Sequence, residues 1–383
     1  MTRSLVGLGL EFAYAGRSVV RGASLAVVPG RVTALVGPSG SGKSTLLWLM
    51  AGLLRPAAGR IVLADSAEAA AVCTKAQVEP SRGGSPYPPR EKCGHELANV
   101  ACAAGTETRR ACGVSGEPVD FARARLGMVF QSSALWEHLT AEEHLSLVLA
   151  GKGFERADRR RRIDDALARL HLEPLRRRRP GQLSGGEARR LALARAIVAD
   201  PEWLLLDEPL VHLDGPTRAE LFATLRDILA RTQAGVLMAT HDAPEAMRLA
   251  AEIVVLAGGA VAQSGPPEEV YRRPVSLAVA RMLGPMSELS GEARSGVLSR
   301  GGRAVLENLP PEMAGPQRLL VRPEDVAFRA ASGGAVTVRR AEFDGAALML
   351  TVDAAGEEVA VRQAEKFEAG ATGCLRLLTA VSA

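Results

Sequence analysis

The chain has 383 residues, of which 47% are hydrophobic and 23% charged, so it is long enough for two or three domains that each bury a core. An aromatic content of 4% argues against a stacking surface for single-stranded nucleic acid, and we expect no nucleic-acid partner. No uncharged apolar run approaches the roughly 18 residues that span a bilayer, and neither end has the pattern of a secretion signal. We therefore expect a cytoplasmic protein that docks on a membrane protein.

The first 36 residues alternate apolar and polar side chains between glycine-containing turns, a pattern that predicts short strands. Tyr14 lies in this region and is one of only three tyrosines. Its ring can stack on a purine face, or it can be a half-buried strand aromatic with no ligand.

A glycine-rich segment follows the apolar run Val32 to Val36, and it reads Gly37-Pro38-Ser39-Gly40-Ser41-Gly42-Lys43-Ser44-Thr45. It matches the pattern G-x-x-x-x-G-K-[ST], in which glycines let backbone N–H groups approach phosphate oxygens. Lys43 neutralises the β- and γ-phosphates, and Ser44 supplies a hydroxyl for Mg²⁺. The positive end of the following helix points at the same anion. The sequence therefore predicts a nucleotide phosphate-binding loop.

Residues 66–115 differ from the rest of the chain in composition and patterning, because they hold four of the five cysteines and show no sustained hydrophobic period. We expect a flexible insertion here. A zinc site is the alternative, but the spacing lacks the paired C-x₂₋₄-C pattern of specific zinc sites. Its candidate ligands are Cys93, His95, Cys102 and Cys112.

The apolar run Leu126 to Phe130 predicts a buried strand that delivers the polar amide of Gln131 at its end, a common position for a site residue. Residues 138–179 then show helical spacing and carry two arginine runs, Arg159 to Arg162 and Arg176 to Arg179. Such runs are usually solvated helix faces; contact with anionic headgroups or an acidic partner loop is the alternative.

The segment Leu183-Ser184-Gly185-Gly186-Glu187 predicts a helix start, because Ser184 and Glu187 have the spacing of a capping box. The adjacent Gly185 and Gly186 leave bare amides at that helix N-terminus, where an anion can bind.

Two further strands end in chemically active side chains. The run Trp203 to Leu206 ends in Asp207 and Glu208, and two carboxylates at a strand end suit metal and water chemistry. Asp214 follows closely. The run Val236 to Thr240 ends in His241, and we expect this histidine to contact the γ-phosphate.

Beyond Gly284-Pro285 the sequence becomes short strands with turns, which predicts a small β-barrel or sandwich. The expected strands cover Leu319 to Val321, Ala335 to Val338, Ala347 to Val352, Glu358 to Arg362 and Cys374 to Leu378.

Together these motifs resemble the ATPase subunit of an ATP-binding cassette (ABC) transporter over nearly all of the chain outside residues 66–115. The resemblance implies that Tyr14 stacks on adenine, that Gly37 to Thr45 form the phosphate loop, that Gln131 is the Q-loop glutamine, and that Leu183 to Glu187 form the signature. It also implies that Asp207 orients the metal, Glu208 is the catalytic glutamate, Asp214 belongs to the D-loop, and His241 is the switch histidine.

The implied fold is α/β. Residues 1–284 are expected to form a P-loop NTPase cassette with a mixed sheet core, an antiparallel β subdomain and a helical subdomain at about 132–182, and residues 287–383 a small all-β regulatory domain. The implied ligands are ATP, and Mg²⁺ held by Ser44, Gln131 and Asp207.

Two features depart from the family pattern. Glu187 replaces the commoner glutamine, a change that preserves the helix cap, and residues 66–115 interrupt a place where the family has a short β-turn. Removing them would join Asp65 to the segment Gly116 to Asp120 and restore a strand, turn and strand.

By the same resemblance the protein is an Mg-dependent ATPase and the motor of an importer, peripheral on the cytoplasmic face of the membrane. Two copies would sandwich two ATP molecules, pair with two transmembrane permease subunits, and act indirectly with a solute-binding protein. The tail segment Val321 to Val326 is similar to the accessory domain of importers for oxyanions, ferric iron, polyamines and sugars. An exporter ATPase, which normally lacks that tail, and a soluble non-transport ABC ATPase are the alternatives.

Overall fold

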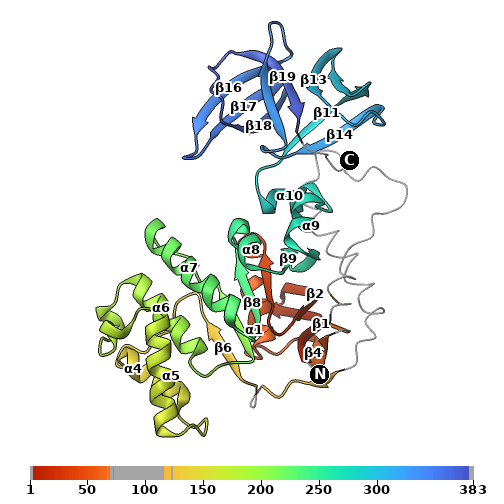
Figure 1. Cartoon of the computed structure of the whole chain (residues 1–383). Coiled ribbons are helices and arrows are strands. Elements are labelled where there is room, and N and C mark those ends of the chain that lie inside the picture. The colour runs from red at the N-terminus through yellow and green to blue at the C-terminus, as the bar shows by residue number, and fades with distance from the viewer. Residues whose placement is uncertain (1–2, 67, 70–71, 73–115, 122–123, 379–383) are drawn as a thin grey trace. The chain divides into compact units, whose positions relative to one another are not determined.

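The computed structural model describes residues 3–66, 68–69, 72, 116–121 and 124–378, and the chain divides into two compact units (Figure 1). The first unit is Met1–Val270 and the second is Tyr271–Ala383. The sequence placed this division at 284–287. In the structure the helix α10 (Leu277–Leu283) groups with the second unit instead.

A six-stranded sheet, in the order β10-β9-β3-β8-β7-β6, forms the centre of the first unit. Its strands are β3 (Val32–Val36), β6 (Leu126–Val129), β7 (Trp203–Asp207), β8 (Gly235–Thr240), β9 (Glu252–Ala257) and β10 (Ala260–Gly265). All neighbours pair in parallel except β9 and β10, which are antiparallel. Because parallel strands end at the same edge, the loops after β3, β6, β7 and β8 converge there.

A second, antiparallel sheet has the order β2-β1-β4-β5. Its strands are β1 (Arg3–Tyr14), β2 (Arg17–Val27), β4 (Ala58–Asp65) and β5 (Glu117–Pro118). Val62 pairs with Pro118, so the chain on the two sides of residues 66–115 forms neighbouring strands, as the sequence predicts.

Most of the predicted insertion, residues 73–115, lies outside the described residues. Its beginning does not fit a flexible insertion. Ala69 and Val72 are helical and at most 2% exposed, and they belong to a hydrophobic cluster with Val6 and Val62 of the antiparallel sheet. This apolar pair therefore covers a sheet face, and the start of the insertion stays a prediction.

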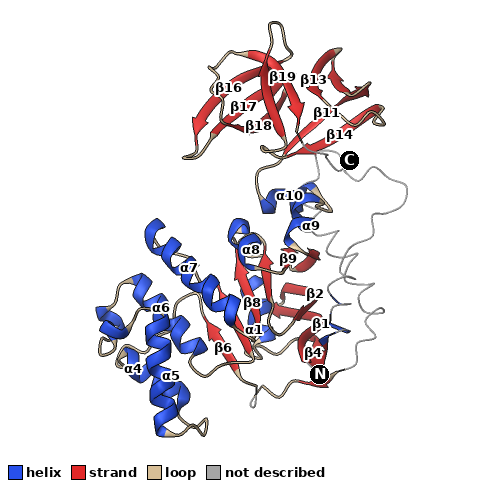
Figure 2. Cartoon of the chain, in the orientation of Figure 1, coloured by secondary structure: helices blue, strands red, loops and turns tan. Residues whose placement is uncertain are grey.

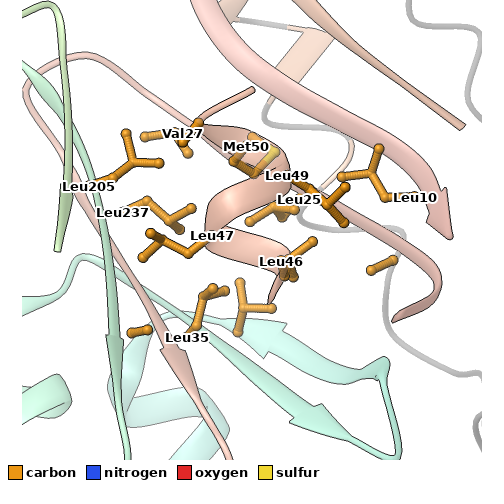
Figure 3. Packing of buried hydrophobic residues seen from close by; sticks show 14 of the residues in the cluster. Leu10, Leu25, Val27, Leu35, Leu46, Leu47, Leu49, Met50, Leu205 and Leu237 are labelled. Atoms are coloured by element: carbon orange, nitrogen blue, oxygen red, sulfur yellow. The ribbon is translucent and has the colours of Figure 1, made fainter. Parts of the chain in front are cut away.

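The helix α1 (Lys43–Met50) lies between the two sheets, and all of its residues are buried except Ser44 and Trp48, which are partly exposed. Figure 3 shows Leu205 and Leu237 of the parallel sheet on one side of α1 and Leu10 of the antiparallel sheet on the other. Full burial of a leucine contributes about 1.5–3 kcal/mol, so this helix start is held by a dense core. The phosphate loop therefore has a rigid base.

Helices cover the rest of the first unit, and Figure 2 shows α4, α5 and α6 grouped beside the edge strand β6. The helices are α4 (Ala141–Leu149), α5 (Arg156–Arg169), α6 (Gly185–Ile197), α7 (Gly215–Arg231) and α8 (Ala243–Leu249), and the division between the units falls within α9 (Pro267–Arg272). Short 3₁₀ turns, Glu173–Leu175 and Pro180–Gln182, lie between α5 and α6. Within the part of the chain that the structure describes, no helix is long and apolar enough to cross a membrane.

The second unit carries one nine-stranded sheet with its own hydrophobic core. Its strands are β11 (Ser287–Arg294), β12 (Val297–Arg300), β13 (Arg303–Glu307), β14 (Gly315–Val321), β15 (Val326–Ala330), β16 (Val336–Phe343), β17 (Leu348–Ala354), β18 (Glu357–Gln363) and β19 (Thr372–Leu377). All five strand regions predicted from the sequence are strands here. The patterns of β11, β12, β13 and β15 were not recognised, because they are short or interrupted by polar residues.

Candidate functional site

The phosphate loop leaves β3 and enters α1 with a backbone that excludes side chains at two glycines. A Cβ atom at Gly37 would lie 2.4 Å from the carbonyl oxygen of Leu256, and one at Gly42 would lie 2.9 Å from that of Val19. Gly42 also has a φ of 98°, which non-glycine residues rarely adopt. These glycines are therefore required by the close backbone approach that forms the loop.

Lys43 is only 5% exposed, and its ammonium group folds back over the loop. Its Nζ atom donates to the carbonyl oxygens of Gly37 at 2.9 Å and Pro38 at 3.0 Å. Burial lowers the pKa of Lys43 from its ordinary value, and the charges of Glu208 and Asp207 act in the opposite direction. The site thus holds a buried cation beside two carboxylates, an arrangement that attracts a polyanion accompanied by a metal ion.

Asp207, the last residue of β7, is 1% exposed and accepts a hydrogen bond from the Ser44 hydroxyl at 2.9 Å. Burial raises the pKa of Asp207, and the bond from Ser44 opposes that shift. Its second oxygen, Oδ2, is buried and accepts no hydrogen bond of good geometry among the described residues, although the indole N–H of Trp48 is near enough to lower the pKa of Asp207 slightly. A buried carboxylate with a spare oxygen beside a hydroxyl is an oxygen donor set that suits Mg²⁺.

Glu208 gathers the side chains from the ends of three strands. Its Oε2 atom accepts from Nε2 of Gln131 at 3.2 Å, and its Oε1 atom lies 3.3 Å from Nδ1 of His241. The Glu208 backbone has a φ of 46°, and its N–H group donates to the carbonyl oxygen of Ala239 at 2.9 Å. The structure therefore brings Gln131, Glu208 and His241 together, as expected from their places at strand ends.

The signature segment starts α6 with the predicted capping box. Ser184 Oγ accepts from the backbone N–H of Glu187 at 3.2 Å, and Glu187 Oε2 accepts from the N–H of Ser184 at 2.7 Å. Gly185 is exposed, whereas a Cβ atom at Gly186 would lie 2.4 Å from Cγ2 of Thr217. Glu187 thus makes the cap that glutamine would make at this position.

Three predicted site residues or segments lie apart from this cluster. In the described ranges, no hydrogen bond or ion pair joins the signature Ser184–Glu187 to the phosphate loop. Asp214 caps α7 by accepting from the N–H of Thr217 at 3.0 Å. Tyr14 is 44% exposed at the end of β1 and packs edge-to-face on Phe12, with 4.9 Å between the ring centroids. The candidate zinc ligands all fall outside the described residues.

Sequence reasoning missed Arg189, a buried arginine of α6 that is 4% exposed. Its guanidinium donates to the carbonyl oxygens of Phe130 and Glu208, each at 2.5 Å. A signal was present, since residue 189 shares the helix stripe of Ala192, Leu193 and Ala196, where periodicity predicts an apolar side chain.

Comparison with known proteins fits this geometry. The family model described as "ABC transporter" matches residues 20–87 and 96–211. The chain is 33% identical over 356 residues to the Fe(3+) ions import ATP-binding protein FbpC 3 of Rhodococcus jostii (strain RHA1), covering 92% of this chain and 88% of that relative. The chain belongs to the ABC transporter family.

Other matches agree with this ABC ATPase assignment. The sn-glycerol-3-phosphate import ATP-binding protein UgpC of Jannaschia sp. (strain CCS1) is 31% identical over 368 residues, covering 94% of this chain and 90% of the relative. A solved structure of the ATP-binding subunit of an ABC transporter has a TM-score of 0.50 at 25% identity, covering 70% of this chain and 92% of that one. The structure of cbiO1 from Clostridium perfringens shares the fold, with a TM-score of 0.51 at 24% identity, covering 71% of this chain and 92% of that one.

These findings confirm three predictions from the sequence. The fold is an α/β ABC cassette followed by an all-β region. The protein is an ATP-binding subunit and an ATPase, the motor of an ABC importer. As such a subunit it works with membrane components of the transporter.

Proposed function

We propose that this ABC ATPase works as a head-to-tail homodimer that holds two ATP molecules, each between the phosphate loop of one subunit and the signature of the other. One observation carries the proposal. Gly185 and Gly186 begin α6, where Gly185 is exposed and Gly186 is buried against Thr217, and no described hydrogen bond joins the signature to its own phosphate loop. A helix N-terminus of this kind binds anions, and a second subunit is the natural source of the phosphate.

Mg²⁺ fits the residues present. Ser44, Asp207 and Gln131 are the side chains that would hold it, and the buried Oδ2 atom of Asp207, which accepts no hydrogen bond of good geometry among the described residues, supports this assignment. When bound, the metal supplies positive charge to the phosphate oxygens.

Glu208 is the proposed general base for hydrolysis. Its carboxylate accepts a proton from the attacking water, while Gln131 and His241 hold the two carboxylate oxygens in place. Lys43 neutralises phosphate charge, and the signature amides of the second subunit complete the shell around the γ-phosphate. Tyr14, exposed at the end of β1, offers its ring to the adenine, and Asp214 positions the D-loop.

The proposed partners are two transmembrane permease subunits on the cytoplasmic face of the membrane, with a solute-binding protein acting through them. The relatives are named for Fe(3+) ions and for sn-glycerol-3-phosphate. We propose that the solute of this transporter belongs to the group of oxyanions, ferric iron, polyamines and sugars. Residues 287–383 act as an accessory regulatory domain, which has its own hydrophobic core.

The variant Glu208→Gln tests the dimer. It keeps the shape of the side chain and removes the base, so ATP should bind and remain unhydrolysed. Gel filtration with ATP and Mg²⁺ should then show a stable dimer that is absent without nucleotide. A variant that stays monomeric at saturating ATP would contradict the proposal, and Lys43→Ala, which should lose ATP binding, is the negative control.

A further inference from the structure

Arg189 hydrogen-bonds to the carboxyl ends of β6 and β7, beyond the last pair of residues that the sheet joins. The parallel strands β6 and β7 pair from Leu126 with Trp203 to Val129 with Leu206. Beyond that last pair, Nη1 of Arg189 donates to the carbonyl oxygen of Phe130 and Nη2 to that of Glu208. The planar guanidinium fork thus continues the link between the two strand ends, which a single-point lysine cannot do.

Glu208 depends on this contact for its backbone conformation. Its φ of 46° is in the left-handed region, which side-chain-bearing residues rarely adopt, so surrounding contacts must hold it. The N–H group is held by Ala239 of β8 and the carbonyl group by Arg189 of α6. Phe130, the other acceptor, directly precedes Gln131, whose amide donates to the Glu208 carboxylate. One guanidinium therefore holds the Glu208 carbonyl group and the peptide group that joins Phe130 to Gln131, and the side chains of Gln131 and Glu208 meet.

The same arginine lies two residues beyond the signature, in the same helix. Ser184 caps the start of α6 and Arg189 follows within that helix, so a shift of the signature moves the guanidinium with it. Arg189 is buried at 4% exposure, and the carboxylates of Asp207 and Glu208 attract its charge.

We propose that Arg189 is a positioning residue that links the signature helix to the backbone of Glu208 and of Phe130, the residue directly before Gln131. This inference rests on the proposed dimer. When the signature of one subunit binds the ATP held by its partner, Arg189 orients Glu208 in the first subunit's own ATP site. The two ATP sites are thereby coupled through one side chain.

The test compares Arg189→Ala with Arg195→Ala. Arg195 is a matched control on the same helix, because it is 9% exposed and also donates to two backbone carbonyls, those of Ser133 and Ala134, but does not touch Glu208. With the full-length protein, Arg189→Ala should lower kcat about 10- to 100-fold with little change in KM for MgATP, since misplacement of a catalytic group by about 1 Å has effects of this size. Arg195→Ala should keep kcat.

Two readouts separate positioning from general damage to the fold. Millimolar guanidinium should restore part of the kcat of Arg189→Ala and do nothing for Arg195→Ala. The double variant Arg189→Ala/Glu208→Gln should still form the ATP-dependent dimer, because the signature amides are unchanged.

The proposal is overturned if Arg189→Ala keeps the parent kcat, if guanidinium rescues neither variant, or if the double variant fails to dimerise where Glu208→Gln alone succeeds. Failure of the proposed function gives a different result. In that case Glu208→Gln itself does not dimerise, or the parent protein does not hydrolyse ATP.

Discussion

Two adjacent signature glycines should respond to alanine in opposite ways. Neither has a positive φ, so an added methyl group favours the helix by about 0.4–1 kcal/mol at each position. At Gly185 the new Cβ atom meets nothing within 4 Å. At Gly186 it lies 2.4 Å from Cγ2 of Thr217, and overpacking of this kind costs about 1–3 kcal/mol. We expect Gly185→Ala to be slightly stabilised and Gly186→Ala to be about 1–2 kcal/mol less stable than the parent.

Thr217→Ser provides the rescue, because it deletes the one methyl group within 3.4 Å of the new Cβ atom and keeps the hydroxyl. The double variant Gly186→Ala/Thr217→Ser should therefore recover most of the lost stability, a coupling that a double-mutant cycle measures. Tryptophan fluorescence during urea unfolding is a suitable assay, since Trp48, Trp136 and Trp203 all lie in the first unit. The reasoning is refuted if Gly186→Ala is as stable as Gly185→Ala, or if Thr217→Ser restores nothing.

Three further predictions follow from other parts of the chain. Burial lowers the pKa of His144 below its ordinary value near 6.5. Neutral His144 therefore stabilises the fold above that pH, and this contribution is lost as the pH falls. The free energy of unfolding should decline more steeply from pH 7 to pH 5 in the parent than in His144→Gln. Deleting residues 73–115 should leave basal ATPase activity intact, whereas a deletion that also removes Ala69 and Val72 should be less stable in urea. Limited proteolysis should cut first within 284–286, the segment between α10 and β11, and leave two resistant fragments; a tail degraded as fast as that segment would oppose this.

The positions of the proposed site residues in the fold were predictable because each is marked by local sequence. A buried apolar run followed at once by Gln131, by Glu208 or by His241 places that side chain at the carboxyl edge of a parallel sheet. The capping box of Ser184 and Glu187 was equally predictable, since all its atoms lie within four residues.

Other features depend on partners distant in sequence, and the identity of those partners was not predictable. Arg189 bonds to carbonyl groups 59 and 19 residues away, and no pattern of side chains identifies a backbone acceptor. Ala69 and Val72 lie in a stretch whose composition suggests no core, yet they cover a face of the antiparallel sheet. The helix α10 (Leu277–Leu283) groups with the second unit, although its sequence continues the helical pattern of the first.

The most direct test of the proposed site is phosphate release by the parent protein and by Glu208→Gln at saturating MgATP, with ATP affinity measured separately. Loss of a positioned general base should lower the rate about 10²- to 10⁴-fold while ATP affinity is retained. Hydrolysis by Glu208→Gln at the parent rate would contradict the assignment of Glu208, and with it the site that Gln131 and His241 form around its carboxylate.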